Sequence, residues 1–373
     1  MKATLFNNEA FFALLRAGLW EEEVHLLPFG NVDFVGVMKL AEEQSVAGLV
    51  AAGIEHITDV KPQKRDVLPF IQRTVALETK NQAMNQFIGS MVGNMREAGI
   101  PTMLLKGQGV AQCYERPLLR ACGDVDFFLR DEDYEKAKVY LTPLATAVET
   151  EYKRYKHLGM IIASWTVELH GSLRMGLPRR INSVLDDIKR DTFSGGNVRL
   201  WDNDGTRVSL LSPENDVVYV FVHLFNHFYK GGLGLRQICD WCRLLWTYRG
   251  TLEVKKVESL IEQMGLVSEW KAFGAFAVDY LGLPDEAMPM YDNASKWKRK
   301  AERIKSFVMT VGNMGHNRDM SYYSKYPYLI RKVVSFSQRV GDLIRHSRIF
   351  PLDSLRFFPG IMLNGLRSTV RGE

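Results

Sequence analysis

The sequence predicts an α+β protein, in which a small mixed β-sheet core is flanked by an N-terminal helical segment and a C-terminal helical region. Three observations predict this class. Helical periodicity dominates both ends of the 373-residue chain, and short apolar runs bounded by glycine interrupt it from about residue 100 onward. An Asn-Asp-Gly turn at 203–205 then indicates a hairpin.

The pattern divides the chain into four segments. Residues 1–99 form an N-terminal helical segment and 100–211 an α/β core; 212–293 form a helical domain that completes a cleft with this core, and 294–373 a basic helical region with a tail. With 46% hydrophobic and 24% charged residues the composition excludes a disordered chain. An apolar run long enough for a membrane span and a signal-peptide core are both absent, which predicts a cytoplasmic protein.

Helices account for the first segment. Apolar residues recur at helical spacing over 8–58, with a break at 28–30, and again over about 66–98. Gly99 then ends the second pattern as a C-terminal cap.

The core alternates strands and helices. Short helices are predicted over 108–116 and 131–141, the second with acids first and lysines later, as the helix dipole favours. Strands are predicted over 100–105, 125–129, 145–150, 158–164 and 165–170, followed by the hairpin over 197–211.

A new helix begins after Ser212, which is placed as an N-cap with proline at the first helical position. The helical pattern continues to about residue 283, with a glycine-rich break at 231–234, and resumes over 294–348. An irregular aromatic tail is predicted after Phe350-Pro351.

The four cysteines are too few for a secreted disulfide framework. Cys239 and Cys242 have redox spacing, but they lie in a helical pattern and lack the second pair that a zinc site needs. The sequence therefore favours buried thiols.

Two carboxylates, Asp124 and Asp126, are separated by one residue at the start of the strand 125–129. Residues i and i+2 point to the same face of a strand, so these like charges repel unless a cation lies between them. Mg²⁺ is commonly held by one or two carboxylates together with substrate phosphates. The alternative is two solvated acids at a strand edge.

The surroundings of the pair favour the metal site. Upstream, Leu104-Leu-Lys-Gly-Gln-Gly109 is a strand that ends in glycines before a helix, where backbone N–H groups and Lys106 could meet a triphosphate. Downstream, Glu168 on the strand 165–170 could supply a third carboxylate.

This combination resembles the DNA polymerase β-like nucleotidyltransferases, and within them a bacterial family described as uncharacterised nucleotidyltransferases. The resemblance covers most of the chain. Glutamate stands at position 168, where aspartate is common in the superfamily. The matching positions are Leu104, Leu105, Lys106, Gly107, Tyr114, Leu119, Arg120, Asp124, Asp126, Glu168, His170, His223, His227 and Asp240.

The resemblance implies transfer of a nucleoside monophosphate from an NTP such as ATP to a hydroxyl acceptor, with two Mg²⁺ or Mn²⁺ ions. It implies that Asp124, Asp126 and Glu168 are the catalytic metal ligands. It also implies cofactor contacts for Lys106, Gly107, Gly109, Arg120 and His170, the first four near phosphate and His170 at the acceptor or behind a ligand.

Alternatives remain for the basic residues and histidines. Lys106 could be a solvated strand end, Arg120 the partner of an acid and His170 a histidine paired within the fold. His223 and His227 have the i, i+4 spacing of zinc hydrolases but lack the companion glutamate, which favours lining of the cleft or ordinary helix packing.

Asp240 is a further position of the resemblance with a structural explanation. It lies four residues after Arg236 and three before Arg243, so on a helix it could pair with either.

Positive charge is concentrated from Lys296 onward, with 16 Lys and Arg against 5 Asp and Glu. A solvated face is the first interpretation, a nucleic-acid surface the second, and a peripheral membrane contact with Phe357, Phe358, Ile361 and Leu363 the third. Because the chain carries no recognised nucleic-acid module, a small-molecule or saccharide acceptor is favoured. The rival hypotheses are an inactive binding or scaffold protein with this fold, and transfer onto protein or RNA.

Overall fold

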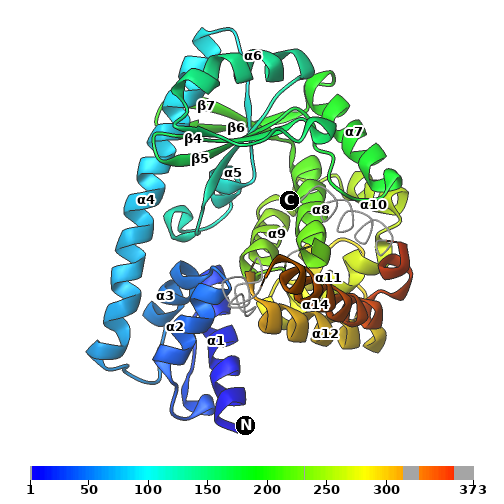
Figure 1. Ribbon diagram of the computed structural model, residues 1–373. Helices are drawn as coiled ribbons and strands as arrows, with labels where there is room; N and C mark the ends of the chain where they lie inside the picture. The colour runs from blue at the N-terminus through cyan, green and yellow to red at the C-terminus, as the bar shows by residue number, and fades with distance from the viewer. Residues whose placement is uncertain (1, 231, 314–326, 357–373) are drawn as a thin grey trace.

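A computed structural model describes residues 2–230, 232–313 and 327–356 of the chain. A single sheet lies between two sets of helices, with α6 on one face and α5, α8 and α9 on the other (Figure 1). This arrangement confirms the predicted fold class, a mixed-sheet core with helical flanks.

The sheet has seven strands in the order β3-β4-β5-β2-β1-β7-β6. Parallel pairs join β2 to β5 and β1 to β7, and the remaining neighbours are antiparallel. The strand bounds are β1 Met103–Leu105, β2 Asp124–Phe128, β3 Ala147–Val148, β4 His157–Ile162, β5 Trp165–His170, β6 Val198–Asn203 and β7 Thr206–Leu211.

Three predicted strands are shorter than expected, and the third, predicted over 145–150, is reduced to Ala147–Val148. The first begins at Met103 rather than residue 100, because the amide of Ile100 still bonds to the carbonyl of Met95 and closes the preceding helix. The fourth ends at Ile162, since Ala163 and Ser164 form a two-residue turn with φ of 47° and 71°. Positive φ at both positions is the geometry of a type I′ hairpin.

The N-terminal helices form a block that α4 connects to the sheet (Figure 1). Helices α1 and α3 pack so closely that a Cβ on Gly18 would lie 1.8 Å from the carbonyl oxygen of Leu49. The bounds are α1 Lys2–Trp20, η1 Leu27–Phe29, α2 Phe34–Glu43, α3 Ala47–Glu55 and α4 Lys64–Glu97.

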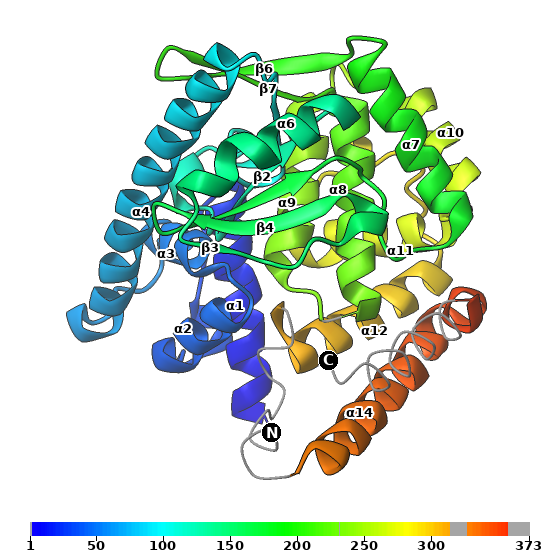
Figure 2. The same cartoon turned by 45° about the horizontal axis from the view of Figure 1, so that its top comes forward.

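Helices α5, α6 and α7 belong to the α/β core, and α7 lies in a stretch for which no element was predicted. In Figure 2, α7 and α10 lie side by side at the edge of the sheet layer, and the hairpin β6–β7 lies above α4. The bounds are α5 Gly107–Ala111, η2 Pro117–Leu119, α6 Asp131–Leu141, η3 Thr142–Leu144, η4 Lys153–Tyr155 and α7 Arg179–Phe193.

The two faces of the sheet differ in chemistry. On one face, Val125, Phe127, Val167 and Leu169 are buried in a core formed with α6 and the end of α4. On the other face the same strands carry Asp124, Asp126 and Glu168 instead, toward α8. The alternation along β2 and β5 thus separates a packed face from a polar one.

The C-terminal helices begin as predicted with Ser212, whose hydroxyl accepts the amide of Asn215 at 3.4 Å. Residues 351–356 are also helical, which corrects the irregular tail predicted after Phe350; Phe357, Phe358, Ile361 and Leu363 lie outside the described residues. The bounds are α8 Pro213–Lys230, α9 Leu235–Tyr248, α10 Val254–Met264, α11 Val267–Leu281, η5 Asp285–Ala287, α12 Ser295–Val311 and α14 Tyr328–Ile349.

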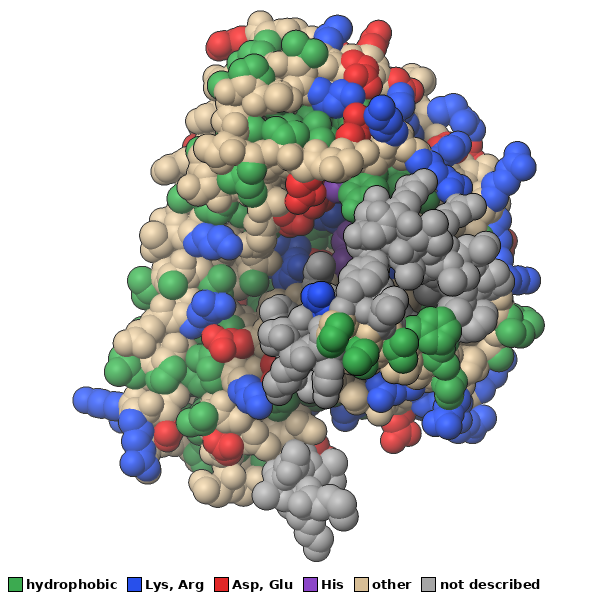
Figure 3. All heavy atoms as spheres, viewed as in Figure 1, with side chains coloured by type: hydrophobic (Ala, Val, Ile, Leu, Met, Phe, Trp, Pro, Cys, Tyr) green, Lys and Arg blue, Asp and Glu red, His purple; other side chains and the backbone are tan. Residues whose placement is uncertain are grey.

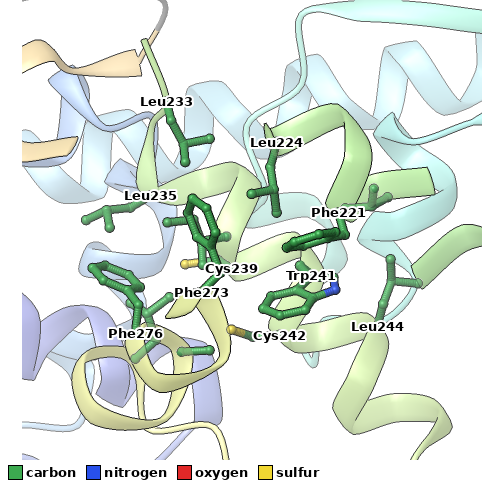
Figure 4. Close-up of a cluster of buried hydrophobic side chains, with 14 of the residues drawn as sticks. Phe221, Leu224, Leu233, Leu235, Cys239, Trp241, Cys242, Leu244, Phe273 and Phe276 are labelled. Atoms are coloured by element: carbon green, nitrogen blue, oxygen red, sulfur yellow. The ribbon is translucent and has the colours of Figure 1, made fainter. Parts of the chain in front are cut away.

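The core of the helical half is aromatic and excludes solvent. Phe221, Trp241 and Phe273 meet there, and Cys239 and Cys242 lie among them (Figure 4). Both thiols are free and buried, as the sequence predicted. The same buried cluster extends from Phe11 through Phe128 to Ile349, so the four segments share one core and their boundaries stay a prediction.

Among the described residues, the helices lack the combination of length and apolar character that a membrane span requires.

Candidate active site

The polar face of β2 carries the predicted carboxylate pair. Asp124 and Asp126 share this face, and the side chain of Asp126 is 1% exposed. The negative charge of Asp126, followed by burial, raises the pKa of Asp124 above its ordinary value. The two charges therefore repel in the folded chain, and a bound cation would relieve this repulsion.

The third acid comes from β5, the parallel neighbour of β2. Glu168 is in register with Asp126, so the two side chains leave the same face of adjacent strands. One carboxylate oxygen from each of Asp124, Asp126 and Glu168 lies within 4.8 Å of the other two. Three oxygens at this spacing fit one or two shared divalent cations, the donor set that Mg²⁺ and Mn²⁺ accept.

Two histidines contact these acids. His170 Nε2 lies 2.8 Å from Asp126 Oδ1 and 3.4 Å from Glu168 Oε2. His157 Nε2 on β4 lies 3.1 Å from the same Glu168 oxygen. Burial acts against the charged forms, but these contacts lower the pKa of Glu168 and raise that of His170.

His157 is a site residue that the sequence analysis missed. Because the hairpin β4–β5 turns at residues 163 and 164, His157 pairs directly with His170. A turn at residues 163 and 164 is the signal that could have revealed it, because that turn sets the pairing of the two strands. The expected strands 158–164 and 165–170 left no residues for a turn, so no pairing register could be assigned.

Lys106 reaches the same cluster from the end of β1. Its Nζ lies 3.0 Å from Asp126 Oδ1 and 3.3 Å from His223 Nε2, and its side chain is 15% exposed. Burial is the largest single influence on Lys106 and would lower its pKa, but the nearby negative groups, Asp126 first among them, together outweigh burial and raise the pKa. Lys106 is therefore a buried cation of the site, and the alternative of a solvated strand end is wrong.

The backbone at this turn is unusual. Lys106 has a φ of 50° and Gly107 a φ of 44°, values that side chains other than glycine rarely adopt. Strained backbone of this kind costs roughly 1–3 kcal/mol and is found at binding sites. Gly109 lies in α5, where a Cβ would come within 2.6 Å of Leu210 Cδ2. Packing against β7 explains glycine at this second position.

Arg120 pairs with an acid outside the carboxylate cluster, which confirms the structural alternative stated for this residue. Its Nε and Nη2 each donate to a different oxygen of Asp240 at 2.7 Å, and the Tyr114 hydroxyl donates to the same carboxylate at 2.7 Å. Tyr114, Arg120 and Asp240 thus form a buried group that joins the core to α9.

Of the two arginine partners predicted for Asp240, Arg236 is confirmed and Arg243 is not. Arg236 lies 3.9 Å away, a weak second contact. Arg243 instead donates to the carbonyls of Cys113 and Leu19 and pairs with Glu115, because its position on α9 points toward the N-terminal helices.

Helix α4 fixes the loop that leads into β2, a contribution that sequence reasoning did not find. Asn81 donates to the carbonyls of Leu118 and Arg120 at 2.7 and 2.9 Å, and Lys80 donates to the carbonyl of Cys122 at 2.9 Å. These bonds set the direction in which the chain enters β2, two residues before the first carboxylate.

Helix α8 faces the site with His223 and His227, whose ring centroids are 4.5 Å apart. Burial lowers the pKa of both, that of His227 to about 4, so both are neutral at pH 7. The contact of His223 with Lys106 places it in the cleft, as the favoured interpretation held. Among the described residues no third metal-binding side chain joins this pair.

Figure 3 shows a hollow in this face of the molecule, between the sheet layer and the helices below it. Acidic, basic and histidine side chains are visible inside the hollow. The polar face of the sheet is thus open to a ligand from this side.

A mixed sheet with acids on two parallel neighbouring strands, beside a glycine turn, defines a nucleotidyltransferase-like protein. More particularly, the chain belongs to the family of uncharacterised nucleotidyltransferases, whose sequence profile matches residues 30–282. No curated protein matches the chain.

One solved structure is similar, an antigenic nucleotidyltransferase-like protein from Paracoccidioides brasiliensis. It is 12% identical, with a TM-score of 0.29, and the match covers 52% of this chain and 90% of that one.

Proposed function

We infer that the protein is a metal-dependent nucleotidyltransferase that transfers a nucleoside monophosphate from an NTP to a hydroxyl acceptor. The observation that carries this conclusion is the convergence of Asp124, Asp126 and Glu168 within 4.8 Å. Divalent ions there would activate the acceptor hydroxyl and stabilise the leaving pyrophosphate. An inactive scaffold would have no need of converging acids, so their convergence speaks against that alternative.

The residues of the chain would divide the work as follows. Asp124, Asp126 and Glu168 hold the ions, while His157 and His170 fix the orientation of the two carboxylates they contact. Lys106, held by Asp126 at the start of the glycine turn, supplies positive charge to phosphate oxygens.

Nucleotide binding tests the proposal. Labelled ATP, CTP, GTP and UTP are titrated with Mg²⁺ or Mn²⁺ against the wild type and the variant Asp124→Asn/Asp126→Asn. We expect metal-dependent binding of at least one nucleotide by the wild type and its loss in the variant. Asp285→Asn/Glu286→Gln removes two exposed carboxyls far along the sequence and serves as the matched control. Equal binding by the site variant and the wild type would refute the metal site.

A further inference from the structure

A cavity of about 650 Å³ opens where β2 and β5 end. Arg130 and Asp131, just after β2, line one side, and Gly171 and Ser172, directly after β5, line another. The rest of the wall comes from η4, α7 and the loop residues Lys156, Arg174 and Ser194. Its volume is in the range of sites that hold one small molecule.

The wall of the cavity is strongly basic. Seven Lys and Arg residues line it against two acids, Asp131 and Asp186. Lys156 and Lys189 both bind Asp131, at 2.6 and 2.9 Å, and Arg174 pairs with Asp186. Several cations therefore remain in excess of the available carboxylates.

The unneutralised charge can be assigned to three residues. Arg130, Lys153 and Arg154 form no ion pair with any residue in the described part of the chain, and all three are exposed. A second cavity of about 470 Å³ shares Arg154 with the first and adds Arg179. Figure 3 shows basic side chains gathered in the region of α6 and α7. Such a concave cationic surface attracts phosphate groups.

The cavity lies on the catalytic side of the sheet. Phe128, on the same face of β2 as Asp126, packs against Phe193 of α7 with ring centroids 4.7 Å apart, and Phe193 lines the cavity. His170, which contacts Asp126, is followed directly by the lining residue Gly171. The cavity thus lies past the carboxyl end of β2 on this side of the sheet, and the buried Phe128 separates it along the strand from Asp126.

The cavity and the glycine turn lie at opposite ends of β2. Gly107 is beside the first residue of the strand, since a Cβ there would lie 3.7 Å from the carbonyl oxygen of Asp124. Arg130 comes two residues after the strand ends. Five strand residues span roughly 13 Å, with Asp124 at the end beside the glycine turn and Asp126 in the middle.

Nucleotidyl transfer needs its two substrates to approach from opposite ends. The attacking hydroxyl and the leaving pyrophosphate lie roughly in line on opposite sides of the α-phosphorus. If the triphosphate lies at the Lys106 end, the acceptor approaches from the end that carries the basic cavity. A cationic wall there suits an acceptor that is itself anionic.

We propose that this cavity, through Arg130, Lys153 and Arg154, binds the phosphate group of a phosphorylated small-molecule acceptor. The acceptor hydroxyl oxygen bonds to the α-phosphorus of the NTP, and the bond from that phosphorus to the β-phosphate oxygen breaks. Pyrophosphate leaves with the electron pair, and the hydroxyl proton passes to water. The role as acceptor rests on the proposed function, whereas phosphate binding by the cavity does not.

Matched probes test the phosphate binding without metal or catalysis. Ribose 5-phosphate and ribose are titrated in EDTA by calorimetry against three proteins. They are the wild type, the cavity variant Arg130→Ala/Lys153→Ala/Arg154→Ala, and a control. The control, Lys255→Ala/Lys298→Ala/Arg299→Ala, removes three exposed cations elsewhere. We expect ribose 5-phosphate to bind the wild type and the control. It should bind the cavity variant at least about tenfold more weakly. Equal binding of ribose, or undiminished binding by the cavity variant, overturns the proposal.

ATP with Mn²⁺ separates the acceptor from the nucleotide. We expect the cavity variant to bind ATP like the wild type, and ribose 5-phosphate to bind together with ATP. Competition between ATP and ribose 5-phosphate would assign the cavity to the triphosphate and overturn the proposal. A single-stranded RNA that binds through the same three cations more tightly than ribose 5-phosphate would also overturn it. If ATP fails to bind while ribose 5-phosphate binds in EDTA, the proposed function fails and the phosphate site stands. Urea unfolding of each variant shows that it is folded.

Discussion

Glu168 accepts contacts from two imidazoles, and this determines which metals suit the site. One ring nitrogen from each of His157 and His170 and an oxygen of Glu168 all lie within 4.8 Å of one another. Nitrogen ligands favour Mn²⁺ and other transition metals over Mg²⁺, which prefers oxygen. Glu168 therefore belongs to two possible sets of metal ligands. One set contains only carboxylates, and the other combines Glu168 with two imidazoles.

We expect Mn²⁺ to bind more tightly than Mg²⁺ and to contact nitrogen, because the imidazoles that orient the carboxylates beside Mg²⁺ can exchange those hydrogen bonds for direct ligation of a transition metal. Pulsed EPR of bound Mn²⁺ detects a directly coordinated ¹⁴N, and this signal should disappear in His157→Gln/His170→Gln, with affinity for Mn²⁺ falling about 10- to 100-fold. His25→Gln/His56→Gln, two histidines of the N-terminal block, is the control. A wild-type spectrum without nitrogen coupling would show that the imidazoles only orient the carboxylates.

Single residues also show how far the sequence could predict the site. The same-face placement of Asp124 and Asp126 follows from the two-residue period of a strand, so it could be foreseen. The contact of His157 with Glu168 depends on the pairing register of two strands, which a single residue more or less in the turn would change. Local periodicity does not contain that information.

At the scale of elements, helix α5 depends on close packing against its neighbours, among them Leu210 of β7. It is five residues long and cannot be stable alone, so its position is set by what it touches. Gly109 provides the contact with Leu210, whereas Gly93 in α4 has open space around its Cβ position. The two helical glycines thus differ in packing but not in chemistry.

We expect Gly109→Ala to lower the free energy of unfolding by about 1–3 kcal/mol, because the added methyl group overpacks the interface with β7. Gly93→Ala adds the same atoms where nothing obstructs them and should raise it by about 0.5–1 kcal/mol. Urea unfolding curves measure both. Equal stability of the two variants would mean that α5 shifts freely, which the packing argument does not allow.

Elements were more predictable than their pairing. The acids that open α6 and the N-cap at Ser212 are local signals, and both helices begin as predicted. The parallel pairing of β2 with β5 joins residues about forty positions apart, and helix α7 follows without a strong start signal. Tertiary packing decides such features, so propensity alone could not supply them.

At the scale of the whole molecule, a buried carboxyl pair connects α11 to residues 351–356. Burial, and then its hydrogen bond with Asp353, raises the pKa of Glu269 to about 8. Arg180 of α7 binds Asp353 at 2.6 Å, so residues 351–356 are tied to two distant elements, to α7 by this ion pair and to α11 by the carboxyl hydrogen bond.

Stability should therefore depend on pH through Glu269. The folded chain keeps this proton up to about pH 8, whereas the unfolded chain loses it near the ordinary value of 4.5. The contribution of Glu269 to the free energy of unfolding is therefore fully present below pH 4.5 and is lost as the pH rises to about 8. Urea unfolding from pH 5 to 8 should show a fall that is smaller in Glu269→Gln. Parallel profiles for the two proteins would contradict this assignment.

The hairpin β4–β5 has a consequence for the evolution of this chain. It carries His157, Glu168 and His170 on one face, on strands joined by only two residues. Inserting or deleting one residue in β5 would turn Glu168 and His170 to the packed face together. Descendants of this sequence are therefore expected to keep the length from 157 to 170 fixed, and to accumulate substitutions there rather than insertions or deletions.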